Sequence, residues 1–231
     1  MPKTGQRIRK HDMKEDSFVT FAFQAQEYIQ HHQKLFLLGL GAVVVLVLGV
    51  WYFSSSGRRT EMAADQRISE AFLRVQQNDM TGAAQIYRTL IDEYGGTAAA
   101  REGLFYLGNL NFVQKRWPEA IEAYEEFARE YGGEDPLRTA AAWTAIGDAY
   151  QSEGEHAKAI EYYEKALRVP EAKSVFAETY LSAARSAVAM GDLDRAQELA
   201  DRLYELESGS PQMTKMRELL ALHGVMYTRG F

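Results

Sequence analysis

Two segments of the chain repeat one spacing of large and small residues, 39 positions apart. In 140–173 the spacing is carried by Trp143, Ile146, Gly147, Tyr150, Ala159, Tyr163 and Ala166. In 101–134 the matching positions hold Leu104, Leu107, Gly108, Ala120 and Tyr124, whereas Asn111 stands at the Tyr position and Phe127 replaces the second Ala. Small residues let two helices approach at their crossing, and large residues fill the space on either side. Both segments therefore predict closely packed helix pairs.

Weaker copies of the pattern flank these two segments. Upstream, a helix expected over 61–77 precedes TGAAQIYRTLIDEYGG, in which Ala83 and Tyr87 match Ala120 and Tyr124. Downstream, 176–207 keeps the spacing with Tyr180, Ala184, Ala196 and Leu203, and 212–226 is expected to form a capping helix. A helix pair cannot bury its apolar face alone, so at least three units must stack. The sequence predicts an all-α solenoid of about four repeats plus a cap.

The spacing resembles the tetratricopeptide (TPR) repeat, a helix–turn–helix unit of roughly 34 residues. In TPR arrays the first helix of each repeat lines a concave face that binds proteins, and the resemblance implies such a face here. The residues it implies are Phe105, Asn109, Phe112, Thr144, Asp148, Gln151, Leu181 and Arg185. Aromatic, amide and sparse charged groups of this kind can take an extended or helical peptide. We therefore expect protein or peptide clients.

Residues 35–53, LFLLGLGAVVVLVLGVWYF, contain no charged side chain. A helix of this length rises roughly 28 Å, close to the hydrocarbon thickness of a bilayer. The aromatic residues at its end suit a membrane interface, and a buried helix of a soluble domain seldom runs this long without a polar face. We predict one N-terminal transmembrane helix that contacts the lipid bilayer. A cleaved signal peptide is the alternative, because Ser54 and Ser56 fit a cleavage site.

Residues 1–34 carry six Lys or Arg against four acidic residues. Basic residues favour the cytoplasmic side, so we expect a cytoplasmic N-terminus in the inner membrane and an extracytoplasmic body. In a Gram-negative bacterium that side is the periplasm. Apolar residues recur at helical spacing within 17–30, which predicts an amphipathic juxtamembrane helix that lies on lipid or docks on another membrane protein. The expected segments are 1–34, the span 35–53 and the repeat domain 54–231.

The remaining composition argues against several functions. Residues 54–231 hold 20 basic and 28 acidic residues, and an acidic body disfavours nucleic acid as a partner. The chain has no cysteine, which excludes thiol catalysis and Cys-ligated metals. His31 and His32 are adjacent, so on a helix they cannot face one metal ion. No catalytic, cofactor or metal-ligand set stands out, and we expect a protein that is not an enzyme.

The order of segments resembles a bacterial family. A short cytoplasmic segment, one membrane helix ending in aromatic residues and a TPR body on the far side are similar to the ancillary subunit of the Sec translocon (the YfgM-like proteins). That resemblance implies a scaffold or chaperone-like adaptor beside the translocon. The alternative is a structural accessory subunit of another membrane complex or an envelope-assembly factor. The two EYGG junctions, each followed by a new repeat, resemble those of TPR proteins of envelope assembly. Lipid-anchored envelope factors need a cysteine that this chain lacks.

Overall fold

The computed structural model of the chain describes residues 33–229, except for the side chains of Gln33, Phe36 and 52–56. The expected helix over 17–30 lies outside these residues, as do the side chains of Phe36, Tyr52 and Phe53 in the expected span. The chain divides into two compact units between Arg59 and Thr60.

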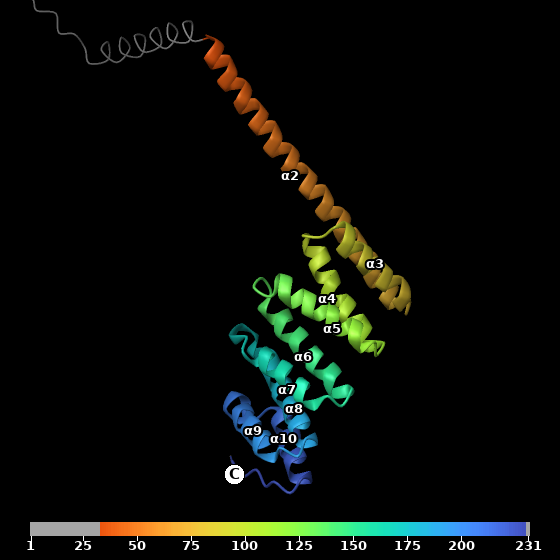
Figure 1. Cartoon of the computed structure of the whole chain (residues 1–231), viewed down its shortest axis with the longest axis vertical. Helices are drawn as coiled ribbons and strands as arrows, with labels where there is room; N and C mark the ends of the chain where they lie inside the picture. Colours follow the sequence, from red (N-terminus) through yellow and green to blue (C-terminus); the bar gives the residue numbers. More distant parts are fainter. Residues whose placement is uncertain (1–32, 230–231) are drawn as a thin grey trace, which may run out of the picture. The chain divides into compact units, whose positions relative to one another are not determined.

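All regular structure in residues 33–229 is helical (Figure 1). The elements are α2 (Gln33–Gln76), α3 (Met80–Glu93), α4 (Ala98–Val113), α5 (Trp117–Tyr131), α6 (Pro136–Ser152), α7 (His156–Leu167), the 3-10 turn η1 (Pro170–Ala172), α8 (Lys173–Ala189), α9 (Leu193–Glu207) and α10 (Pro211–Leu222). The expected all-α repeat architecture is confirmed. Two boundaries differ from expectation: the helix expected over 61–77 is the end of the longer α2, and the cap ends at Leu222.

Consecutive helices from α3 to α9 pack against one another, and α10 packs on both α8 and α9. The first helices of the repeats are the end of α2, α4, α6 and α8, and the second helices are α3, α5, α7 and α9. Short connections of this kind place neighbouring helices antiparallel. The second unit is thus a stack of helix pairs closed by α10.

Each turn from a first to a second helix contains one residue in the left-handed region of φ. These residues are Asn78 (60°), Lys115 (57°), Gly154 (80°) and Gly191 (77°). A left-handed residue at this point ends a helix by turning its last carbonyls toward backbone donors. Glycine adopts the conformation without a steric cost, asparagine at a small one, and lysine at a larger one.

Glycine is required where the two helices cross in the second and third repeats. A Cβ atom built on Gly108 would lie 2.7 Å from Cδ1 of Tyr124, and one on Gly147 would lie 2.5 Å from Cε1 of Tyr163. Both tyrosines are buried. The small and large residues that define the repeat therefore face each other directly.

The apolar stretch 35–51 belongs to α2. Among residues 33–229, no helix combines the length and the apolar character that crossing a bilayer requires.

Candidate functional site

Three of the expected binding residues lie on α4 in the second repeat. The ring of Phe105 is half-buried and packs 5.3 Å from the ring of Phe127 and 5.8 Å from that of Tyr124, between centroids. Phe112 lies edge-on to Trp117 at 5.0 Å. Both phenylalanines therefore support the helix pair while keeping part of their surface exposed.

Asn109 and Asp148 hold matching places in consecutive repeats. The Tyr124 hydroxyl donates to Asn109 Oδ1 at 2.6 Å, and the Tyr163 hydroxyl donates to Asp148 Oδ1 at 2.7 Å. Each pair joins the first helix of a repeat to the second. The two residues thus each orient a buried tyrosine.

The carboxyl of Asp148 is partly shielded from solvent by burial. Burial, with Glu178 as a weaker cause, raises the pKa of Asp148, and the hydrogen bond from Tyr163 opposes this shift. Burial and the neighbouring Asp148 carboxylate raise the pKa of Tyr163. The tyrosine therefore stays protonated and remains the donor in this pair.

Thr144 and Gln151 connect α6 to the next repeat. Thr144 Oγ1 lies 3.0 Å from Thr179 Oγ1. Gln151 Nε2 donates to the Ser182 carbonyl at 3.0 Å and to Ser186 Oγ at 2.8 Å. These contacts fix the register of α6 against α8, so both polar groups are engaged within the solenoid.

The two expected residues on α8 differ in exposure. Leu181 is fully buried, in the same apolar cluster as Leu199, Met213 and Leu220. This corrects its expected place on the binding surface, and the cause is the capping helix α10, which covers this part of α8. Arg185 is exposed and its guanidinium lies 3.6 Å from the Glu178 carboxylate.

An apolar groove with a cavity of about 290 Å³ lies between the end of α2, α3 and α4. Its lining residues are Phe72, Val75, Met80, Tyr87, Tyr106, Asn109, Leu110 and Val113. Of the eight expected binding residues, Asn109 is the one that lines it. For Phe72 the sequence contained a signal: Phe72 follows Ala71 as Asn109 follows Gly108, so both hold the same repeat position.

No group of three or more His, Asp or Glu residues in 33–229 has the arrangement of a metal site. Several of the described charged groups form surface ion pairs. An example is Arg138, which lies between Asp135 and Glu102.

The tetratricopeptide repeat family matches residues 96–172. Among curated proteins, none shows significant sequence similarity to the chain. A tetratricopeptide repeat protein from Parabacteroides merdae has a similar solved structure, with a TM-score of 0.59 and 16% identity over 71% of this chain and 61% of that one. This chain therefore spans less than two thirds of that protein.

Two further solved structures are similar. MamA protein matches with a TM-score of 0.54 and 19% identity over 70% of this chain and 84% of that one. BtubC from P. vanneervenii matches with a TM-score of 0.56 and 17% identity over 72% and 82%. At these identities the likeness shows the fold alone. Residues 96–172 thus carry tetratricopeptide repeats within an all-α helical-repeat body, and the predicted similarity to translocon subunits stays a prediction.

Proposed function

We propose that the protein is a membrane-anchored TPR scaffold that binds other proteins through the apolar groove between α2, α3 and α4. TPR repeats are interaction modules, which supports protein partners in general. The groove is the observation that carries the proposal. Its volume is below the range usual for drug-sized ligands and fits one or two apolar side chains.

The occupant we propose is an extended client segment with a large apolar side chain. The groove walls are aliphatic and aromatic, and Asn109 supplies one polar group at the wall. Its Oδ1 accepts from Tyr124, while its Nδ2 has no hydrogen-bond partner among the described residues. A peptide carbonyl would satisfy this donor, which is how extended segments combine backbone hydrogen bonds with apolar contacts.

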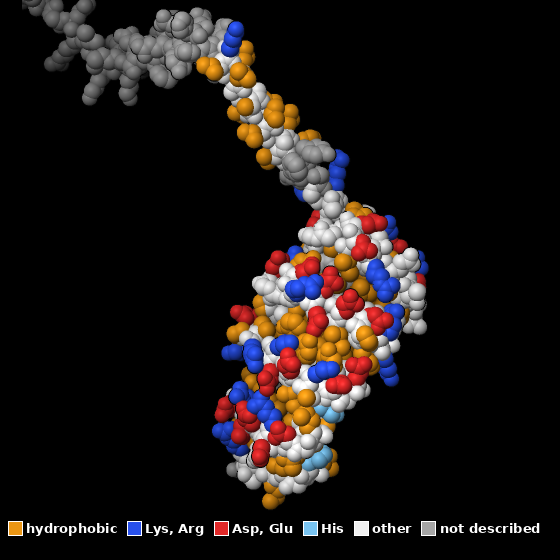
Figure 2. All heavy atoms as spheres, in the orientation of Figure 1, with side chains coloured by type: hydrophobic (Ala, Val, Ile, Leu, Met, Phe, Trp, Pro, Cys, Tyr) orange, Lys and Arg blue, Asp and Glu red, His pale blue; other side chains and the backbone are white. Residues whose placement is uncertain are grey.

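The anchoring part of the proposal rests on α2. Its stretch 37–51 carries no charge, and hydrophobic side chains follow one another along it (Figure 2). Leu38 is 71% exposed and Val45 is 69% exposed. Soluble proteins rarely expose a continuous apolar surface of this kind, so lipid is its proposed environment.

The basic residues of 1–34 support a cytoplasmic N-terminus and an extracytoplasmic, periplasmic body. The resemblance to ancillary translocon subunits supports a place beside the Sec translocon in the inner membrane. There the groove would receive newly translocated, still unfolded segments, in the manner of a chaperone-like adaptor.

Peptide binding tests the groove. The full chain in detergent micelles is titrated with a labelled extended peptide carrying a central Phe, and binding is followed by fluorescence anisotropy. Val113→Asp changes a groove residue that is 72% exposed, so the fold should tolerate it. We expect at least about fivefold weaker binding, the loss typical of an interface residue that matters.

The matched control is Leu222→Asp, which alters an exposed leucine on the cap, outside the groove. Equal weakening by both variants would show non-specific apolar binding and contradict the groove. Topology is tested separately: protease added to spheroplasts should degrade 60–231, and full protection would contradict the periplasmic placement. Co-purification of Sec components with varied clients, rather than one stoichiometric complex, would support the translocon position.

A further inference from the structure

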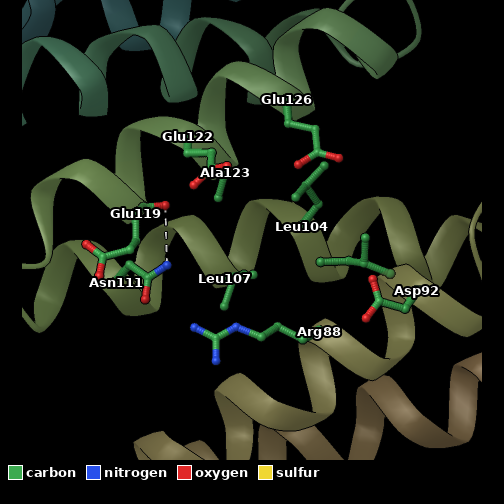
Figure 3. Close-up of a pocket in the computed structure, with 10 residues that line it drawn as sticks. Arg88, Asp92, Leu104, Leu107, Asn111, Glu119, Glu122, Ala123 and Glu126 are labelled. Carbon is green, nitrogen blue, oxygen red and sulfur yellow. Dashed lines mark hydrogen bonds between the residues drawn. The ribbon is translucent and has the colours of Figure 1, made fainter.

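A second cavity, also of about 290 Å³, opens between α3, α4 and α5 (Figure 3). It lies outside the apolar groove and shares no lining residue with it. Leu104 and Leu107 of α4 form its floor. Glu119, Glu122 and Glu126 project from α5 along one side, and Arg88 and Asp92 of α3 lie on the other. Four carboxylates and one cation, Arg88, therefore line the cavity.

The side chain of Asn111 lines this cavity and is only 2% exposed. Its Nδ2 donates a long hydrogen bond, 3.4 Å, to the Glu119 carbonyl (Figure 3). Its Oδ1 is buried and has no hydrogen-bond partner. A buried acceptor without a donor is unfavourable, so the site lacks a donor that can reach Oδ1.

The next repeat shows what normally fills this place. The positions of Asn111 and Ala123 are held there by Tyr150 and Tyr162, whose rings stack with centroids 5.4 Å apart. Lys165 Nζ lies 3.9 Å from the centroid of the Tyr162 ring. Replacing two tyrosines by Asn and Ala leaves the volume of two rings empty, and that is the origin of the cavity.

The second helix of this repeat also carries acidic residues where the later repeats carry basic ones. Glu119 and Glu126 hold the positions of Lys158 and Lys165, and of Arg195 and Arg202 in the last repeat. In that last repeat the cation is paired within the chain, because Arg195 contacts both Glu164 and Glu198. Within residues 33–229, by contrast, none of the four carboxylates at the cavity forms an ion pair. Four unpaired carboxylates in the cavity walls therefore face a single cation, Arg88.

We propose that this cavity receives an arginine side chain from a partner protein. The aliphatic stem would lie on Leu104 and Leu107, as long cationic side chains do on apolar surfaces. The guanidinium would donate to Asn111 Oδ1 and to the carboxylates of α5. Five N–H donors in a planar fork suit several acceptors spread around the cavity better than an ammonium does. A bare metal ion fits less well, since no three acidic groups in 33–229 converge on one point.

The proposal rests on the proposed function only in that the ligand is part of another protein. Binding at the two sites can be followed separately, because Asn109 lines the groove and Asn111 lines this cavity. The chain has only three asparagines, Asn78, Asn109 and Asn111. Labelling asparagine with ¹⁵N therefore gives one side-chain amide for each site and a third, in a turn, as an internal reference.

The test is an NMR titration of the ¹⁵N-Asn full chain in detergent micelles with the capped peptide Gly-Arg-Gly. We expect a saturable shift of the Asn111 side-chain amide, with Asn78 and Asn109 unchanged. The same peptide with citrulline, which is neutral and nearly isosteric, should give no saturable shift. No shift with the arginine peptide, or an equal shift with the citrulline peptide, would overturn this proposal. Neither result would bear on peptide binding in the apolar groove.

Charge-removing variants test whether the acidic wall residues favour arginine binding and whether Arg88 opposes it. Glu126→Gln should weaken arginine binding roughly two- to fivefold, as expected for a half-exposed charge pair. Glu161→Gln is the matched control, because Glu161 holds the position of Glu122 one repeat on and pairs with Lys165. Arg88→Gln should strengthen binding by removing a like charge from the wall. Weaker binding in Arg88→Gln, or equal weakening by Glu161→Gln, would contradict an arginine in this cavity.

Discussion

The hydroxyl of Tyr163 donates a hydrogen bond to Asp148 over 2.7 Å, and this bond ties the first helix of its repeat to the second. One repeat earlier, Asn109 accepts the equivalent bond from Tyr124. The two sites share geometry and differ in charge. They therefore form a matched pair for measuring what the charge of a partly buried acceptor does to stability.

Asp148→Asn should make the stability of the body less dependent on pH. Burial raises the pKa of Asp148 in the folded state, so its protonated form favours folding. That contribution is complete below the unfolded pKa of about 3.9 and is lost as pH rises through the raised folded pKa. Asn keeps the acceptor for Tyr163 and has no charge to desolvate. Urea unfolding should show the variant up to about 1 kcal/mol more stable at pH 7 and equal at low pH.

The reciprocal variant supplies the control for this prediction. Asn109→Asp introduces a carboxylate at the equivalent place, so its stability should fall relative to the parent as pH rises. A difference between parent and Asp148→Asn that is the same at all pH values would show that ionisation of Asp148 is not the cause.

Gly147→Ala and Gly108→Ala should each destabilise the fold by about 1–3 kcal/mol, the usual cost of overpacking. The added methyl group would meet the ring of Tyr163 or Tyr124 at 2.5 or 2.7 Å. Gly133→Ala is the control, because a Cβ there meets nothing within 4 Å. Thermal unfolding followed by far-UV circular dichroism measures all three. An unchanged transition in Gly147→Ala would mean that the helices can separate without cost.

Lys115→Gly should stabilise the fold by about 0.5–1 kcal/mol. Lys115 has a φ of 57°, and this left-handed conformation costs a residue with a side chain about 1–2 kcal/mol. Glycine avoids that cost, but its greater conformational freedom in the unfolded state lowers the stability by about 0.5–1 kcal/mol. The opposite change, Gly154→Ala at a φ of 80°, should destabilise by a similar amount. Denaturant midpoints that move in the same direction for both variants would contradict the role of the left-handed turn.

Leu181→Ala should lower the free energy of unfolding by about 3–5 kcal/mol, since the side chain is fully buried. Arg185→Glu, one helical turn along on α8, should change it by less than about 0.5 kcal/mol because the guanidinium is exposed. Calorimetry of the two variants decides this. Similar losses in both would contradict the burial of Leu181 beneath the cap.

Val45→Arg should release a fraction of the protein from the membrane. An arginine at the centre of a membrane helix costs about 2.5–3.5 kcal/mol, and Val45 lies within the apolar stretch of α2. Met62→Arg is the control, because Met62 is an exposed apolar residue beyond Arg58 and Arg59. Alkaline extraction of membranes followed by immunoblotting measures the released fraction, and equal retention of both variants would argue against the anchor.

The helix pairs could be predicted from the sequence because the spacing that defines them is local. Gly147 and Tyr163 are 16 positions apart in one helix–turn–helix unit, and their close approach depends on little outside that unit. The prediction of about four repeats followed from the same spacing. The positions of Asn109 and Asp148 beside buried tyrosines are consistent with it too.

Burial and cavities depend on how helices of neighbouring repeats and the cap pack together, and the repeat spacing does not give this packing. Leu181 is interior because α10 covers α8, and Gln151 is engaged because Ser182 and Ser186 of the following repeat lie against it. Asn111 was visible in the sequence as a departure from the repeat. Only the packing of α3, α4 and α5 showed that this departure opens a cavity with an unpaired acceptor and unpaired carboxylates. Local spacing determined the fold of each repeat, whereas contacts between repeats decided which residues remain available to a partner.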